Sequence, residues 1–137
     1  GINVFAGNDK ATVVTDTGVI SDDILRRLDD TTLLVLEANY DPHMLRFGPY
    51  QPFLKQRVAS DEGHLSNEMA AQALLMMKRP NFMQVILAHR SENNNNAVLV
   101  TQTIGKMLVD GGVRIGPEMK LQHGQPNEIV SIQSVKR

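Results

Sequence analysis

The chain has 137 residues, no cysteine and a formal net charge of −1 at pH 7. This length fits one domain or part of a larger one. The lack of cysteine excludes a disulfide framework, a thiolate metal site and a thiol nucleophile, and it is compatible with a reducing cytoplasm. The charge excludes a global positive field for nucleic acid, so a phosphate-binding site has to be local. No apolar run approaches the roughly 20 residues of a membrane helix. We therefore expect a cytoplasmic protein with no membrane segment.

Two short strands are predicted at the start of the chain. Residues 2–5 and 11–15 are rich in β-branched and apolar side chains, and a turn separates them. The second strand ends at Asp16. In α/β folds, a carboxylate at the carboxyl end of a buried strand is a common position for a ligand or a catalytic group. The alternative is that Asp16 only caps the turn through an Asx hydrogen bond.

A capped helix and a second buried strand follow. Ser21 precedes two acidic residues, as at a helix N-terminus, and the apolar run 32–36 has the length of a strand buried on both faces. This strand ends at Glu37. Because burying a carboxylate without a partner is costly, Glu37 needs a hydrogen-bonded or cationic neighbour. A histidine or an arginine is the natural candidate.

The central segment places a histidine at the start of a helix. Apolar residues recur every three or four positions from Leu65 to Met77, which predicts a helix with one face on the core. Ser66 suits the N-cap, and the free N–H groups there make a local anion site at which Ser66 and Asn67 could bind a phosphate oxygen. His64 lies just before this site. The alternative is that His64 is a polar loop residue beside a surface helix.

A third buried strand, residues 83–88, ends at His89. Strands that alternate with helices predict an α/β fold with a largely parallel sheet. Parallel strands leave their carboxyl ends along one edge, so we expect Asp16, Glu37 and His89 to lie close together there. Carboxylate oxygen and imidazole nitrogen both bind divalent cations. This edge is therefore a candidate metal site.

The last part of the chain predicts a helix and a hairpin. The apolar stripe of residues 97–109 follows a polar asparagine tract and ends at a pair of glycines. Residues 119–122 and 128–133 predict two strands joined by a turn. His123 falls at that turn, where exposure to solvent is more common than a functional role.

Five short motifs occur in order along the chain: T-D-T-G, L-E-A-N-Y-D, L-K-Q-R, G-H-L-S-N-E and L-A-H-R-S-E-N-N. Together they resemble the WalJ/YycJ-like branch of the metallo-β-lactamase-fold hydrolases, which is related to the tRNA 3′-processing ribonuclease Z group. Each motif alone is short, but five in the same order with similar spacing make a specific signal. The resemblance extends from about residue 13 to residue 96.

The resemblance implies a fold, a metal centre and roles for the residues at the sheet edge. The family's fold is a four-layer αββα sandwich with two divalent metal ions, zinc or manganese, at one edge. Asp16 matches the aspartate that bridges the two metals, and His89 matches the last metal-ligand histidine. His64 matches the histidine that assists at the scissile phosphate or leaving group, and Glu37 resembles the acid that orients it.

The family's main metal motif, H-x-H-x-D-H, is absent from the sequence. The resemblance therefore implies that residues 1–137 are a partial metallo-β-lactamase-fold domain, the C-terminal half without the N-terminal half that carries this motif. Two ligands cannot fill a two-metal site, because even one catalytic zinc usually has three protein ligands. We expect the chain alone to be inactive, to bind few metal ions or none, and to pair with the missing half or with a second copy of itself.

Three functions compete at this point. In the first, the complete protein is a dinuclear-metal phosphodiesterase, a DNA exonuclease with nucleic acid as its substrate. In the second, the chain is a catalytically incomplete module for assembly or binding, whose uncovered sheet face drives association. In the third, the complete protein is a hydrolase of the same fold that acts on a small ester, thioester or lactam.

Overall fold

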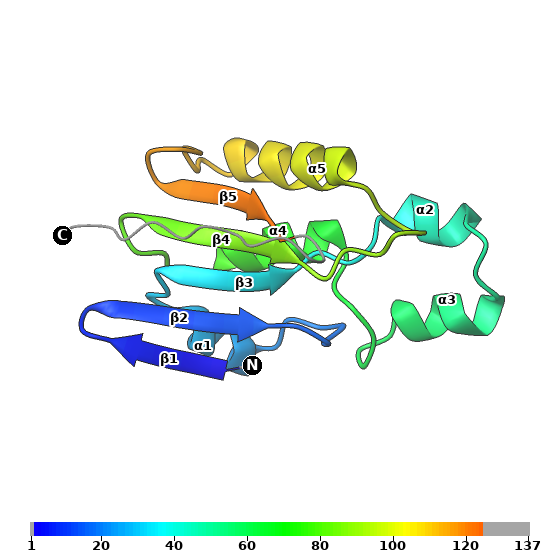
Figure 1. Cartoon of the computed structure of the whole chain (residues 1–137), viewed down its shortest axis with the longest axis horizontal. Helices are drawn as coiled ribbons and strands as arrows, with labels where there is room; N and C mark the ends of the chain where they lie inside the picture. The colour runs from blue at the N-terminus through cyan, green and yellow to red at the C-terminus, as the bar shows by residue number, and fades with distance from the viewer. Residues whose placement is uncertain (1, 125–137) are drawn as a thin grey trace.

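The computed structural model describes residues 2–124, and Figure 1 shows how their helices and strands are arranged. In chain order the elements are β1 (Ile2–Ala6), β2 (Asp9–Val14), α1 (Asp22–Leu28), β3 (Leu33–Glu37), α2 (Pro42–Phe47), α3 (Pro52–Val58), α4 (Asn67–Met76), β4 (Met83–Ala88), α5 (Ala97–Asp110) and β5 (Met119–His123). Across residues 2–124, no helix is both long and apolar enough to cross a membrane.

The five strands form one mixed sheet in the order β1-β2-β3-β4-β5. β1 pairs with β2 in the antiparallel sense, whereas each neighbouring pair from β2 to β5 is parallel. The predicted α/β fold with a largely parallel sheet is confirmed. Because β2, β3 and β4 are parallel neighbours, their carboxyl ends lie side by side at one edge of the sheet (Figure 1).

Helices α1, α4 and α5 pack on one face of this sheet and form the core with it. Leu28 of α1, Leu74 of α4 and Ile104 of α5 are fully buried in one cluster with Leu34 of β3 and Val85 of β4. Complete burial of one such side chain is worth about 1.5–3 kcal/mol. The predicted apolar face of the central helix is therefore confirmed, and this face fixes where α4 begins relative to the sheet edge.

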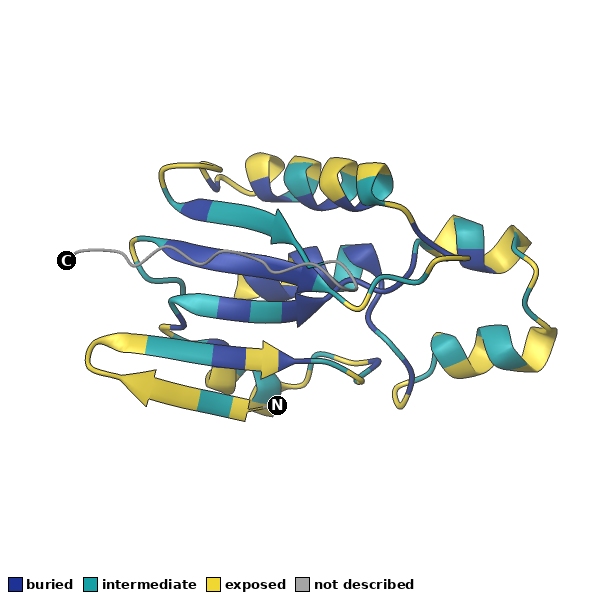
Figure 2. Ribbon diagram, viewed as in Figure 1, coloured by how far each residue is buried: buried dark blue, intermediate teal, exposed yellow. Residues whose placement is uncertain are grey.

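The opposite face of the sheet carries a row of apolar side chains. The strand register places Ile2, Val13, Val35 and Ile86 next to one another across β1 to β4. Among residues 2–124, no helix packs on this face, and Figure 2 shows exposed residues along β1 and part of β2. Ile2 is 67% exposed and Val13 37% exposed, whereas Ile86 is buried. An apolar sheet face open on one side is typical of a surface that packs against another layer.

The position of helices α2 and α3 and the pairing of the last strand go beyond what the sequence predicts. Helices α2 and α3 lie beyond the carboxyl ends of the strands, next to the edge where the strands end (Figure 1). β5 is a strand as predicted, but it pairs in parallel with β4, and the second strand predicted at residues 128–133 lies outside the described residues. His123 is the last residue of β5 instead of a turn residue, so that prediction was wrong.

Candidate metal centre

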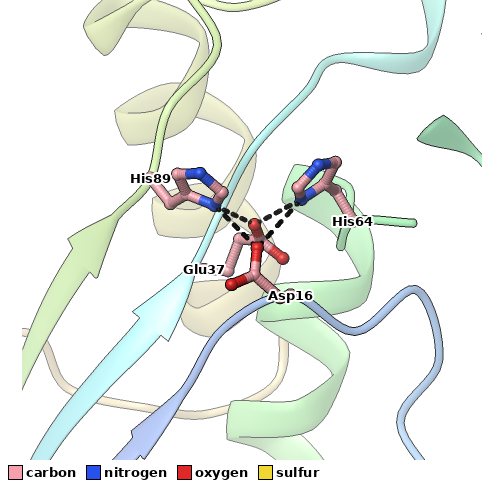
Figure 3. Close-up of side chains that lie close together, drawn as sticks. All are labelled: Asp16, Glu37, His64 and His89. Carbon is pink, nitrogen blue, oxygen red and sulfur yellow. Dashed lines mark hydrogen bonds and ion pairs between the residues drawn. The ribbon is translucent and has the colours of Figure 1, made fainter. Parts of the chain in front are cut away.

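Four ionisable side chains meet at the carboxyl edge of the sheet (Figure 3). Glu37 is the last residue of β3, His89 follows β4 directly, and Asp16 lies just after β2. His64 comes from the loop that leads into α4. One ligand atom from each residue lies within 4.8 Å of the others. The predicted convergence of Asp16, Glu37 and His89 is therefore confirmed, and His64 joins them.

Glu37 lies at the centre of this cluster and is fully buried. Its Oε1 accepts hydrogen bonds from Nδ1 of His64, at 2.7 Å, and from Nδ1 of His89. Its Oε2 accepts the backbone N–H of Leu65 at 3.2 Å. These three bonds satisfy the buried carboxylate, which confirms that it has histidine partners.

The shared carboxylate sets the tautomer of both histidines. An ionised carboxylate only accepts hydrogen bonds, so with Glu37 ionised each imidazole donates from Nδ1, and a neutral imidazole then keeps a lone pair on Nε2. Such a pair of bonds is the usual way in which a carboxylate orients histidines that bind metals or transfer protons. The two rings lie edge to face, with their centroids 5.0 Å apart.

Asp16 completes the cluster on the solvent side. Its Oδ1 lies 3.6 Å from Nδ1 of His89 and 3.9 Å from Nδ1 of His64, and its side chain is 72% exposed. Asp16 and His89 have left-handed backbones, with φ of 58° and 57°. Residues other than glycine rarely adopt this conformation, and they keep it where the surrounding structure holds them. The chain therefore bends sharply after both strands, where these side chains enter the cluster.

Close backbone contacts hold the two loops on either side of the site. The N–H of Gly18 donates to the carbonyl of Asp61 at 2.9 Å, and a Cβ on Gly18 would lie 1.7 Å from the carbonyl oxygen of Ser60. A Cβ on Gly63 would lie 2.2 Å from the carbonyl oxygen of Val58. Only glycine fits at either position. The contacts of Gly18 hold the loop after Asp16 against the loop that carries His64.

Ser66 and Asn67 lie at the start of α4, where both side chains are buried and hydrogen-bonded within the protein. Ser66 Oγ accepts the N–H of Met69 at 3.1 Å, which confirms the predicted N-cap. Asn67 exchanges two amide hydrogen bonds with Asn95, at 3.0 and 2.8 Å. Phosphate binding by Ser66 and Asn67 stays a prediction, and these internal bonds argue against it.

Two asparagines that the sequence analysis did not select connect the chain segments that surround the site. Asn95 also donates to the carbonyl oxygen of Ala38, and Asn39 donates to the carbonyl oxygen of His89 at 2.7 Å. The segments after β3, before α4 and after β4 are thus tied to one another. The asparagine tract before α5 was the available signal. Asn96 caps α5 by accepting the N–H of Leu99, but capping explains only this one asparagine of the tract.

Two cavities open beside His89. The first, of about 750 Å³, is lined by Asp16, His89, Arg90 and Ala97, the first residue of α5. The second, of about 360 Å³, lies on the other side and is lined by His64, His89, Arg90 and Tyr50. A ligand can therefore approach the cluster from either side.

His123 lies close to the first cavity and is partly buried. Its Nε2 is 2.9 Å from Oγ1 of Thr101 on α5. Burial lowers the pKa of His123, and the positive charge of Arg90 lowers it further. This histidine therefore stays neutral at pH values at which an exposed histidine begins to gain a proton.

The donor set fits a divalent cation. Two carboxylates and two imidazoles offer oxygen and nitrogen ligands, which suit zinc and manganese alike. Glu37 already accepts three hydrogen bonds, so the exposed carboxylate of Asp16 and the histidine nitrogens that face away from Glu37 are the donors best placed for a cation.

Comparison with known proteins gives similar sequences over nearly the whole chain. "Exodeoxyribonuclease YycJ" of Bacillus anthracis is 33% identical over 128 residues, which are 93% of this chain and 48% of that protein. "Exodeoxyribonuclease WalJ" of Streptococcus pneumoniae, in strains D39 and R6, is 35% identical over 124 residues, which are 90% of this chain and 46% of that protein. This chain is similar in sequence to these WalJ and YycJ proteins. The predicted resemblance is thus confirmed, and the chain spans about half the length of the curated relatives it matches.

The WalJ/YycJ-like assignment rests on these sequences alone. No family model matches the chain. No solved structure matches it either.

Proposed function

We propose that this chain is one half of a divalent-metal-dependent exodeoxyribonuclease of the metallo-β-lactamase superfamily. The observation that carries the proposal is the convergence of Asp16, Glu37, His64 and His89 at one sheet edge, in a chain whose relatives are named exodeoxyribonucleases. A cluster of acids and imidazoles between two cavities is a common arrangement for metal-assisted hydrolysis.

Each residue of the cluster has a role in this proposal. Asp16 and His89 would hold the divalent cations. When bound, these cations would polarise the phosphate and make water acidic enough to attack it. Glu37 holds His64 through Nδ1, so that a doubly protonated His64 can donate the proton on its Nε2 to the leaving oxygen of the phosphodiester and become neutral.

The remaining metal ligands come from a partner in this proposal. The chain spans about half of its relatives, and no helix within residues 2–124 packs on the second face of its sheet. A second layer that covers this face, from the missing N-terminal half or from a second copy of the chain, would complete a sandwich. Residues 1–137 are then a partial domain, and the isolated chain is inactive.

The open sheet face also favours a second candidate, a module for assembly without catalysis. Exposed apolar residues such as Ile2 and Val4, at 67% and 58% exposure, would be buried in such an assembly. Activity of the complete protein separates the two candidates. The third candidate, a small-ester or thioester hydrolase, is disfavoured by the names of the relatives, and a substrate panel tests it.

The test is cleavage of an end-labelled oligodeoxynucleotide by the complete protein, with metal content measured on the same samples. His89→Ala should lose metal and activity together. His64→Ala should keep its metal and lose about 10²–10⁴-fold in rate, the usual contribution of a general acid. His43→Ala, an exposed histidine on α2, is the control and should change neither.

An unchanged rate in His64→Ala would remove the catalytic role of this histidine. Full metal content in His89→Ala would remove the proposed metal site. Turnover by the purified 137-residue chain with added Mn²⁺ or Zn²⁺ would contradict the proposal that the chain is an inactive half.

A further inference from the structure

Arg90 occupies the position next to His89 and lines both cavities beside the cluster. Within residues 2–124, no other lysine or arginine lines either cavity. Arg90 is partly buried, so its charge is held near the site instead of extending into open solvent.

The guanidinium of Arg90 has no hydrogen bond or ion pair with any other described residue. Other basic residues of the chain do have such partners. Lys10 donates to two backbone carbonyls, Arg79 donates to two carbonyls at the end of α4, and Arg114 pairs with Glu118. A guanidinium carries five N–H donors, and leaving them unpaired in a partly buried position is unfavourable.

The wall of the second cavity holds another polar group without a partner. Asn94 is 1% exposed, and neither its Oδ1 nor its Nδ2 has a hydrogen-bond partner in the described part of the chain. Buried amides are almost always paired with protein, water or ligand. Two unpaired polar side chains next to the same cluster indicate that a polar ligand completes this surface.

We propose that Arg90 binds a phosphate of the substrate, next to the phosphate that is cleaved. This inference rests on the proposed nuclease function and names the group that holds the strand in place. A guanidinium matches a phosphate with two parallel hydrogen bonds, which fixes orientation as well as position. Because the chain has a net charge of −1, such a contact has to come from a single well-placed cation.

Arg90 is partly buried and lines both cavities, whereas the side chains of Ser66 and Asn67 are buried and bonded to other groups of the protein. It lies between the cavity that reaches Asp16 and the cavity that reaches His64. A strand held there would present its phosphodiester to both residues at once. Arg90 is thus a substrate-binding residue, with no part in proton transfer.

The test is binding of a single-stranded oligodeoxynucleotide to the complete protein, measured by fluorescence anisotropy over a series of salt concentrations. Each phosphate contact contributes to the slope of log K against log salt concentration, and losing one reduces the slope by about one. Arg90→Met should lose this increment and about tenfold or more in affinity, equally for all base sequences. Its KM should rise while its metal content stays at the wild-type value.

Two further variants make the result specific. Arg90→Lys should keep the salt slope but lose part of the affinity, because an ammonium cannot form the paired hydrogen bonds. Arg26→Met removes a charge from α1, where Arg26 is exposed and pairs with Asp23, and it should leave binding unchanged. The same series on 5′-hydroxyl and 5′-phosphate ends shows whether the bound phosphate is internal or terminal.

The outcomes separate this inference from the proposed function. If the wild-type protein cleaves DNA and Arg90→Met keeps its salt slope, Arg90 does not bind phosphate and the proposed function stands. If Arg90→Met loses metal along with affinity, its role is structural and the inference fails. If the wild-type protein neither binds nor cleaves DNA, the proposed function fails and this inference fails with it.

Discussion

Replacing Glu37 by glutamine tests how one carboxylate organises the whole cluster. The substitution keeps the shape of the side chain and exchanges one oxygen for an NH₂ group. Glu37 accepts three hydrogen bonds in a fully buried position, two from imidazoles and one from the backbone N–H of Leu65. Glutamine has only one oxygen, so it cannot serve both sides of this site.

Either orientation of the new amide carries a cost. If the oxygen faces the histidines, the NH₂ group meets the N–H of Leu65, and one hydrogen bond to a charged group, worth about 1.5–3 kcal/mol, is lost. If the NH₂ group faces the histidines, His64 and His89 must accept at Nδ1 and carry their protons on Nε2. They then lose the lone pairs that would bind metal or move a proton. Loss of a carboxylate that orients a metal ligand lowers metal affinity about 10–100-fold.

The assay combines two measurements on the complete protein. Nitrogen-15 NMR of the imidazoles reports the tautomers without metal, and competition with a chromophoric chelator reports metal affinity. Glu37→Gln should change one or both tautomers or destabilise the protein, and it should lower metal affinity in each case. Glu68→Gln, in the first turn of α4 and outside the cluster, is the matched control. Wild-type metal affinity with unchanged tautomers in Glu37→Gln would refute the reasoning.

Four other substitutions give independent checks, three by chemical denaturation and Gly18→Ala by metal affinity. Asn95→Ala removes the buried amide pair and should lower the free energy of unfolding by about 1–3 kcal/mol, whereas exposed Asn93→Ala should change it by less than about 0.5 kcal/mol. Gly18→Ala places a Cβ 1.7 Å from a carbonyl oxygen and should displace the loop after β2, seen as lost metal affinity. Gly105→Ala meets open space within α5 and should raise stability by about 0.5–1 kcal/mol. His123 has a lowered pKa, so the unfolded chain binds its proton first, and stability should fall as pH drops below about 6.5. A smaller fall in His123→Gln would identify this histidine as one source, and an equal fall would exclude it.

The sequence predicts the sheet edge well because the relevant signals are local. Each of the three predicted strands that lead to the site is a short β-branched or apolar run, and each is followed at once by Asp16, Glu37 or His89. Parallel pairing then brings these ends together whatever the details of the connections. The need of a buried carboxylate for a partner was also predictable, since it follows from the cost of burying charge.

The parts that escaped prediction depend on contacts between distant segments. Asn67 and Asn95 are 28 residues apart, and nothing in either segment alone shows that their amides pair. The unpaired state of Arg90 is visible only when every neighbour is in place. The pairing of β5 with β4 was not predicted, because a short apolar strand followed by a turn does not show which strand it pairs with.

The left-handed backbone at Asp16 and His89 has a consequence for how such chains change over time. Holding a side chain in this conformation costs of order 1 kcal/mol or more at each position, whereas glycine adopts it freely. Selection for thermal robustness alone would therefore replace both residues by glycine. In a descendant that has abandoned its chemistry, glycine at either bend would remove this conformational cost.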